Sequence, residues 1–304
     1  MAFELREELD AREDVDLLIG LSGGTGSGKT YTAMRLATGM ARALGQDWFA
    51  IVDTENRRAR HYADFFRFKS IDLTPPFTPE RYTEALAAAA AKSRVIVVDS
   101  MSHEWAGEGG VLEMQEAEFA AMNYQDSKKL LSWVKPKMAH KRMVQRLLQF
   151  RAHLILCHRA ESKIDMVKEG GRTVVKPKEG LTGTHGWFPV AEKNLAFELT
   201  VSLLLEQERP GVPVPIKLQE QHKHLFPLDE PITEETGLKL VEWAAGGAID
   251  WPARIEAAQD LAQLRALRKQ IDLIRAAMPE SARAIIQTSF NDRLQELQQR
   301  GGDQ

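Results

Sequence analysis

Cysteine and long apolar runs are almost absent from this chain of 304 residues. It contains one cysteine, Cys157, so it cannot form an internal disulfide, and this usage fits a reducing compartment. The longest uninterrupted apolar stretch is the run at 85–91, which is far too short to span a bilayer. We therefore expect no membrane partner.

An excess of positive charge is also missing. The net charge is −3, so any affinity for nucleic acid has to come from a local patch. Residues 1–16 contain seven acidic residues and two arginines, a net charge of −5, which is the opposite of a secretory leader with its basic start. We predict a cytoplasmic protein.

What the sequence does contain is a glycine-rich phosphate-binding pattern near its start. Residues 23–30 read GGTGSGKT and fit G-x-x-x-x-G-K-[ST] at every fixed position. Residues 16–21 read as a buried strand and residues 31–44 have helical spacing, which is the context that the motif requires. Glycines adopt backbone conformations closed to other residues, so successive N–H groups can converge on one anion at the positive end of the helix.

This motif predicts binding of a nucleoside triphosphate, with ATP and Mg²⁺ as cofactors. Lys29 would reach the β and γ phosphates, and the Thr30 hydroxyl would ligate the metal. The predicted binding residues are Gly23, Gly24, Thr25, Gly26, Ser27, Gly28, Lys29, Thr30 and Tyr31.

Strand-like and helical segments alternate over the first half of the chain, which predicts a mostly parallel sheet flanked by helices. The phosphate site would lie at the carboxyl ends of the strands. Thr78 is predicted to cap a helix that runs to about residue 92. The other predicted segments are strands at 48–52, 95–98 and 153–157, and a mostly helical stretch to residue 150 that is broken at Pro136.

The second half of the chain changes character twice. Residues 159–193 read as a long polar loop, followed by strands at 197–206 and 212–218 and by a helix that Thr233 caps. Residues 252–300 have apolar residues at three- and four-residue spacing, which predicts an amphipathic helical hairpin. The predicted fold is therefore an α/β core with a C-terminal α-helical hairpin. The predicted domains are a core at 1–228, a helix and linker at 229–250, and a helical tail at 251–304.

Two acidic side chains follow predicted strands. Asp99 ends the run at 95–98 and would hold Mg²⁺ through its waters, near Thr30. Hydrolysis also needs a carboxylate that orients the attacking water. Many such ATPases place a glutamate directly after the metal aspartate, but this chain has Ser100 there. The strongest substitute is Glu55, at the end of the neighbouring strand.

The phosphate loop, IVDTE at 51–55 and VIVVDS at 95–100 resemble, in this order and spacing, the core of RecA-type recombinases. The resemblance covers about residues 16–226 and includes EKNLAFEL at 192–199. It implies a RecA-like P-loop ATPase in which Glu55 activates water, with Glu104 as the second candidate. The run at 99–110 resembles phage-encoded RecA-type recombination ATPases more closely, which implies a phage origin and the cytoplasm of a bacterial host.

The chain departs from this family at two places. The fourth strand ends in His158 where the family has a glutamine or asparagine that senses the γ-phosphate, so His158 is a candidate sensor or an ordinary strand-end residue. After the last strand, the phage group often carries a basic patch that enters a neighbour's ATP site. Lys217 or Lys223 would be the trans-acting cation here, or each is a solvated surface lysine.

A DNA-binding surface is predicted from the charge pattern. Residues 127–159 contain nine basic residues and no acidic one, which favours a polyanionic partner. The following residues to 180 are also basic overall, which suits contact with the backbone of single strands. The alternative is a subunit interface with the acidic N-terminus. The predicted DNA-binding residues are Lys137, Lys141, Arg142, Arg146, Lys163, Lys168 and Arg172.

Together these features predict an ATPase of a phage recombination or replication system that acts on single-stranded DNA as a homo-oligomer. The helical tail would dock on the core, a neighbouring protomer or another phage protein. The alternatives are a helicase-type DNA motor or packaging ATPase, a small-molecule kinase with 159–193 as its lid, and a regulatory subunit that does not hydrolyse ATP.

Overall fold

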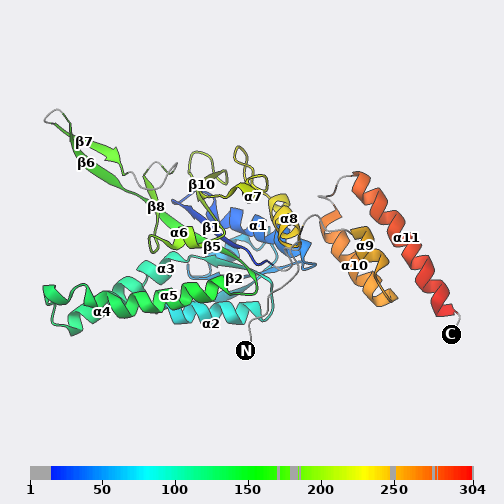
Figure 1. Ribbon diagram of the computed structural model, residues 1–304, viewed down its shortest axis with the longest axis horizontal. Helices are drawn as coiled ribbons and strands as arrows, with labels where there is room; N and C mark the ends of the chain where they lie inside the picture. The colour runs from blue at the N-terminus through cyan, green and yellow to red at the C-terminus, as the bar shows by residue number, and fades with distance from the viewer. Residues whose placement is uncertain are drawn as a thin grey trace, which may run out of the picture.

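The computed structural model describes residues 15–169, 172–178, 184, 186–246, 251–275, 278 and 280–302. Its centre is an eight-stranded sheet in the order β10-β9-β1-β5-β4-β2-β3, with β8 paired to β5 (Figure 1). A separate two-stranded sheet consists of β6 and β7. The strands are β1 (Leu18–Gly23), β2 (Phe49–Asp53), β3 (Phe68–Asp72), β4 (Val95–Asp99), β5 (His153–Ser162), β6 (Ile164–Glu169), β7 (Arg172–Pro177), β8 (Trp187–Pro189), β9 (Val201–Leu205) and β10 (Pro213–Lys217).

Helices cover both faces of this sheet, as the alternation of strands and helices predicts. The helices are α1 (Lys29–Ala43), α2 (Pro79–Ala90), α3 (Ser102–Ala106), α4 (Val111–Ala121), α5 (Val134–Leu148), α6 (Leu195–Glu198), α7 (Glu220–Lys223), α8 (Glu234–Ala244), α9 (Trp251–Glu256), α10 (Leu261–Ile274) and α11 (Glu280–Gly302), with 3₁₀ turns η1 (Arg58–Tyr62), η2 (Asp126–Lys128) and η3 (Leu131–Trp133). Among the residues described, no helix has the length and apolar character that a bilayer crossing needs.

The central strands are parallel and buried on both faces. β1 pairs in parallel with β5 and β9, and β4 pairs in parallel with β5 and β2. Every residue of β1, β2 and β4 is buried, which explains why their sequences are continuous apolar runs without alternation. The strand order places β5 between the strand that leads into the phosphate loop and the strand that ends at Asp99. Both strands therefore deliver their carboxyl ends to one edge of the sheet.

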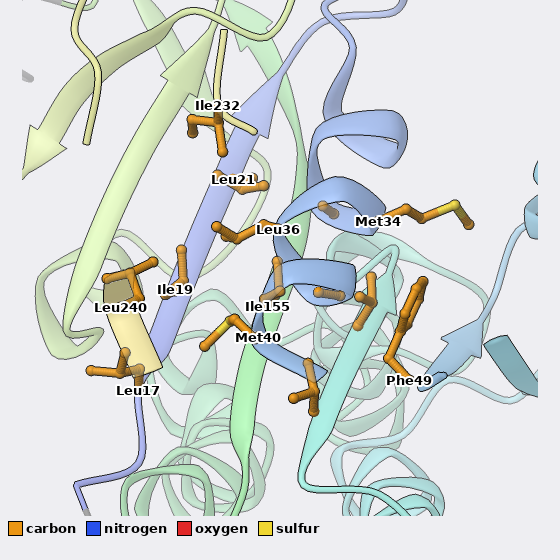
Figure 2. Packing of buried hydrophobic residues seen from close by; sticks show 14 of the residues in the cluster. Leu17, Ile19, Leu21, Met34, Leu36, Met40, Phe49, Ile155, Ile232 and Leu240 are labelled. Carbon is orange, nitrogen blue, oxygen red and sulfur yellow. The ribbon is translucent and has the colours of Figure 1, made fainter. Parts of the chain in front are cut away.

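Two apolar cores hold the helices against the sheet. The first packs α1 and α8 on one face, and Figure 2 shows Leu36 and Met40 of α1 close to β1 and Ile155 of β5. The second packs α2 and α5 on the other face. Helices α1 and α8 approach closely, because a Cβ at Gly39 would collide with the backbone of Glu234. These contacts fix the position of α1, whose first residue is Lys29.

Helix α8 belongs to the first core, although the sequence places it in the predicted helix and linker at 229–250. Thr233 caps it with a capping box, as predicted, and Leu240 and Val241 are buried in the core around α1. Helices α9, α10 and α11 form a third apolar cluster at the end of the molecule opposite β6 and β7 (Figure 1). The predicted hairpin of α10 and α11 is present, and α9 is an additional helix before it.

Two predicted segments differ in the structure, and one strand was not predicted. Helix α5 begins at Val134, so Pro136 lies in its first turn and does not break it. The N–H groups of a first turn have no acceptor within the helix, so a proline costs no hydrogen bond there. The strand predicted at 197–206 starts only at Val201, after the short helix α6. The edge strand β3 is not apparent from the sequence, since its residues are only half-buried or exposed.

The predicted polar loop at 159–193 contains a projecting β-hairpin. β6 and β7 pair antiparallel and extend away from the body of the molecule (Figure 1). Their apolar residues Ile164, Met166, Val167, Val174 and Val175 do not alternate regularly with polar ones, so the sequence shows no clear period of two here. Gly170 and Gly171 lie between the two strands in sequence and outside the described residues.

The strand at one edge of the sheet contains two prolines. β10 pairs antiparallel with β9, and its residues Pro213 and Pro215 lie opposite Leu205 and Leu203. A proline has no N–H and is tolerated in a sheet only where that group would not be needed for pairing. The outer side of β10 therefore lacks two backbone donors.

Candidate functional site

The phosphate loop has the geometry of an anion cradle. Gly26 and Gly28 have φ of +82° and +83°, a left-handed conformation that side chains disfavour. A Cβ at Gly23 would collide with the side chain of Ser27 and the carbonyl of Leu205. The Ser27 hydroxyl donates to the Gly24 carbonyl at 2.9 Å, which fixes the turn from inside. This loop therefore requires its glycines, and its backbone N–H groups precede a helix N-terminus.

Lys29 lies across this loop. Its Nζ donates to the Gly24 carbonyl at 2.8 Å, so the ammonium is held where the phosphates of a nucleotide would lie. Burial lowers the pKa of Lys29, while the nearby Cys157 and the carboxylates of Asp99 and Glu55 act in the opposite direction. The charge of this lysine is therefore placed in a partly dehydrated pocket, where its interaction with phosphate is strong.

Thr30 and Asp99 meet at the head of α1. The Thr30 hydroxyl donates to Oδ2 of Asp99 at 2.6 Å. Asp99 is buried, and burial raises its pKa to about 6, with the Thr30 hydrogen bond acting against this rise. Within the described residues no cluster of three or more His, Cys, Asp or Glu side chains could hold a metal. Thr30 and Asp99 would supply two oxygens to Mg²⁺, which is commonly held by one or two protein oxygens together with phosphate oxygens and water.

Glu55 is held between two arginines. Its Oε1 accepts from Nη2 of Arg159 at 2.8 Å, and its Oε2 accepts from Nη1 of Arg58 at 2.8 Å. Burial acts to raise the pKa of Glu55, but the hydrogen bonds from Arg159 and Arg58 outweigh it and hold the pKa below its ordinary value. Glu55 is therefore an ionised carboxylate at neutral pH.

These groups line one open cleft of about 590 Å³ at the carboxyl ends of the strands. The phosphate loop forms one side, and Asp99, Glu55 and the two arginines form the other. Loop N–H groups, Lys29 and the arginines would hold the phosphates, and Thr30 and Asp99 would hold Mg²⁺. The arrangement can position a triphosphate, neutralise its charge and present a carboxylate to a water molecule.

The comparison with known families agrees with this geometry. The sequence matches the family described as AAA domain over residues 16–182, which is more than half of the chain. The chain belongs to this family. Its phosphate loop and its family make it a P-loop ATPase. No curated protein matches the sequence. A solved KaiC-like protein from the hyperthermophilic archaeon Pyrococcus horikoshii is 15% identical, with 57% of this chain and 84% of that chain covered and a TM-score of 0.30.

The AAA domain contains two cleft residues that the sequence analysis did not assign. Arg159 is among the basic residues counted for DNA binding, but its guanidinium bonds Glu55 in the cleft. Arg58 follows Glu55 by three residues at the start of η1. Its position soon after the strand-end glutamate is the signal that could have identified it.

His158 is not among the residues that line the cleft, and its role as phosphate sensor stays a prediction, beside the alternative of an ordinary strand-end residue. Successive side chains of a strand point to opposite faces of the sheet, so Arg159 faces the phosphate loop and His158 faces away from it. His158 is 3% exposed and lines a different cavity. The cation at the end of β5 that lies in the cleft is thus Arg159.

Glu104 also lies away from the residues that line the cleft. It is 1% exposed on α3, and its Oε1 is 2.9 Å from Nδ1 of His140 on α5. Burial raises the pKa of Glu104, while the hydrogen bond with His140 opposes this rise. The structure thus places the second candidate for water activation in a buried pair between two helices, and Glu55 in the cleft.

The predicted trans-acting lysines differ in their surroundings. Nζ of Lys217 donates to the carbonyls of Phe197 and Leu199 at 2.7 and 2.5 Å, so this lysine is engaged within its own chain. Lys223 forms an exposed ion pair with Glu220 at 2.6 Å. Tyr31, the last predicted binding residue, packs against Tyr62, whose side chain lines the cleft, and against Phe66.

The predicted DNA-binding residues fall on two surfaces. Lys141, Arg142 and Arg146 are exposed on α5 and have no ion pair among the described residues, and Lys137 lies 5.5 Å from the ring centre of Trp133. Lys163 and Lys168 are exposed at the hairpin β6–β7, and Arg172 begins β7, with its side chain outside the described part. The positive charge of α5 is thus a surface feature of the fold.

Asp99→Asn is expected to stabilise the nucleotide-free protein at neutral pH. A rise in pKa from 3.8 to about 6 means that the buried carboxylate costs about 3 kcal/mol when it is ionised. This cost is fully present above about pH 6 and is relieved as the pH falls and the carboxylate takes up a proton. Calorimetry should therefore show a higher Tm for the variant at pH 7.5 and a smaller difference at pH 5.

Asp64→Asn is the matched control, because Asp64 is exposed. It should leave the Tm within about a degree of the unchanged protein at both pH values, since isolated surface charges contribute little. An Asp99→Asn protein less stable than the parent at pH 7.5 would contradict the account of this buried carboxylate.

Proposed function

We propose that this protein hydrolyses ATP with Mg²⁺ in a phage recombination or replication system, where it acts on single-stranded DNA as a homo-oligomer. The observation that carries the hydrolytic part is the cleft, in which Lys29, Thr30, Asp99 and Glu55 come together from three strand ends. The charge of α5 and of the hairpin supports the DNA part.

The residues of the cleft divide the work of hydrolysis. Glu55 orients a water molecule for in-line attack on the γ-phosphate and takes up its proton. Lys29, Arg159 and Arg58 stabilise the charge that develops on the phosphate oxygens. Thr30 and Asp99 would hold Mg²⁺, which would supply positive charge to offset the negative charge of the phosphates. In this oligomer a basic residue of a neighbouring protomer, with Lys223 as the candidate, adds a further charge.

Single-stranded DNA suits the basic surface of α5, because the side chains there are exposed and form few hydrogen bonds within the protein. Basic groups on one helix face neutralise phosphates without reading the sequence. The helical tail, α9 to α11, supplies a separate apolar unit for contact with a neighbouring protomer or another phage protein.

The test is the ATPase rate with and without single-stranded DNA, at several salt concentrations. Stimulation that falls steeply with salt supports the proposal, because phosphate contacts release counterions. A rate indifferent to DNA but raised by a small-molecule acceptor would favour a kinase. Processive strand displacement would favour a DNA motor. Particle size with a non-hydrolysable ATP analogue reports assembly.

Reversing three charges on α5, in a Lys137→Glu, Lys141→Glu, Arg142→Glu variant, should weaken DNA binding at least tenfold. Each phosphate contact contributes to affinity and to its salt slope, so the slope should fall by about three. Fluorescence anisotropy with labelled oligothymidylate measures both quantities. Affinity for the ATP analogue should not change.

The matched control reverses three positive charges at other places on the protein, so its net charge changes by the same amount. Lys92, Arg265 and Lys269 are exposed on other elements, so reversing them alters the total charge equally. If both triple variants lose the same affinity, only the overall charge matters. If the α5 variant binds DNA normally but no longer assembles, α5 is a subunit interface instead.

A further inference from the structure

A second cavity lies on the other face of the sheet from the phosphate loop. Its volume is about 270 Å³, near the lower end of the range for ligand pockets, about 300 Å³. It is lined by Ser22 of β1, His158 of β5 and residues of the segment that follows the hairpin. This cavity accommodates one heterocycle rather than an extended ligand. Nothing in the hydrolytic cleft uses its residues.

The floor of this cavity holds an unpartnered polar group. His158 is 3% exposed, and its Nε2 has no hydrogen-bond partner in the described part of the chain. Burial lowers the pKa of His158 to about 4, so the imidazole is neutral at pH 7. A buried nitrogen without a partner loses the free energy of a hydrogen bond, unless a ligand or water supplies one.

The walls of the cavity are aromatic, and its mouth is basic. Phe188 is half-buried and Phe197 is 50% exposed, so two aromatic rings border the space between floor and solvent. Lys163 and Lys193 are exposed at the mouth, and Nζ of Lys163 lies 5.4 Å from the ring centre of Phe188. One carboxylate, that of Glu192, is among the residues that line the cavity, whereas three carboxylates line the cleft. Glu192 accepts a hydrogen bond from the backbone N–H of Asn194 at 2.7 Å.

We propose that this cavity binds a single unstacked nucleotide, with its base between the aromatic rings, a base-edge group on Nε2 of His158 and its phosphate at Lys163 and Lys193. Proteins hold unpaired bases in this way, by stacking them on aromatic rings, hydrogen-bonding their edges and binding the flanking phosphates. We favour a nucleotide that belongs to a single DNA strand lying along the basic hairpin, and this choice of ligand rests on the proposed function. A free nucleotide has the same chemistry.

The experiment compares oligothymidylate with a fully abasic strand of equal length, using the full-length protein saturated with a non-hydrolysable ATP analogue. The analogue keeps the hydrolytic cleft out of the measurement. The unchanged protein should prefer the base-bearing strand about tenfold, the effect expected of one stacked base. His158→Phe fills the cavity and should reduce this preference to less than twofold, while binding of the abasic strand stays the same.

His222→Phe is the matched control. His222 is also buried and has unpartnered ring nitrogens among the described residues, but it packs against Trp243 of α8. It should keep the tenfold preference. Phe197→Ser is a second test variant that does not depend on replacing a buried residue, since Phe197 is half-exposed, and it should reduce the preference as well.

A second arm identifies the source of the nucleotide. The deoxynucleoside monophosphate of 2-aminopurine is titrated under the same conditions, and its fluorescence reports stacking. Quenching that His158→Phe removes, without a preference between strands, supports the cavity and assigns it to a free nucleotide. If the protein binds neither strand but quenches the monophosphate, the DNA part of the proposed function fails and the cavity assignment stands. If neither signal is seen, or both survive in His158→Phe and Phe197→Ser, the assignment is overturned.

Discussion

Lys29→Ala is expected to abolish ATP binding and turnover. The ammonium is the cation positioned over the phosphate loop, and it would make charge-assisted hydrogen bonds to two phosphate groups. Losing two such bonds is worth about 4 kcal/mol, or about a thousandfold in affinity. Titration calorimetry with Mg²⁺ and a non-hydrolysable ATP analogue measures the loss. Heat of binding equal to that of the unchanged protein would end the interpretation of residues 23–30 as a phosphate loop.

The control for Lys29→Ala is the same substitution at a lysine outside the cleft. Lys92, just beyond the end of α2, is exposed, and Lys92→Ala should bind the analogue with unchanged affinity. Circular dichroism on both variants checks that the fold is kept. The sheet should tolerate Lys29→Ala, because α1 is held mainly by its apolar face and by α8.

Glu55→Gln is expected to keep ATP binding and to lower the turnover number by a factor of about 10² to 10⁴, the usual contribution of a general base. The amide has the same shape, and its one oxygen can still accept a hydrogen bond from one of the two arginines, but its NH2 group cannot accept from the other and it cannot take a proton from water. Single-turnover hydrolysis of ATP is the measurement, since it separates chemistry from product release. A variant with unchanged single-turnover rate would remove Glu55 from the mechanism.

Glu104→Gln distinguishes the two glutamates. Its carboxylate is paired with His140 inside the protein, so the variant should hydrolyse ATP at close to the normal rate. It should instead alter stability, since it changes a buried pair. If Glu104→Gln loses hydrolysis and Glu55→Gln does not, the water-activating role moves to Glu104.

The hydrolytic cleft could largely be predicted from the sequence, because its parts carry strong local signals. The phosphate loop is a contiguous pattern, and the apolar runs before Asp53 and Asp99 are buried strands of a parallel sheet. Parallel neighbours end at the same edge, so the proximity of Glu55, Thr30 and Asp99 follows once the strands are recognised. The α/β class and the C-terminal helices follow from the same periodicities.

The sequence does not show whether the side chain of His158 or that of Arg159 faces the phosphate loop. Strand β5 is apolar on both faces, so no alternation in its sequence shows which parity faces α1. The hairpin could not be predicted either, because its two strands are rich in charge and lack a regular alternation of apolar and polar residues. The ion pair of Glu55 with Arg159 joins residues that are 104 positions apart, which a local pattern does not contain.

The two prolines of β10 limit how copies of this protein can associate. A strand from another molecule can lengthen a sheet only where the edge offers a regular row of amide hydrogens, and Pro213 and Pro215 interrupt that row. Two copies of the chain would therefore have to meet through side chains rather than by continuing the sheet past this edge. Copies that met in this way would share no ladder of backbone hydrogen bonds at this edge.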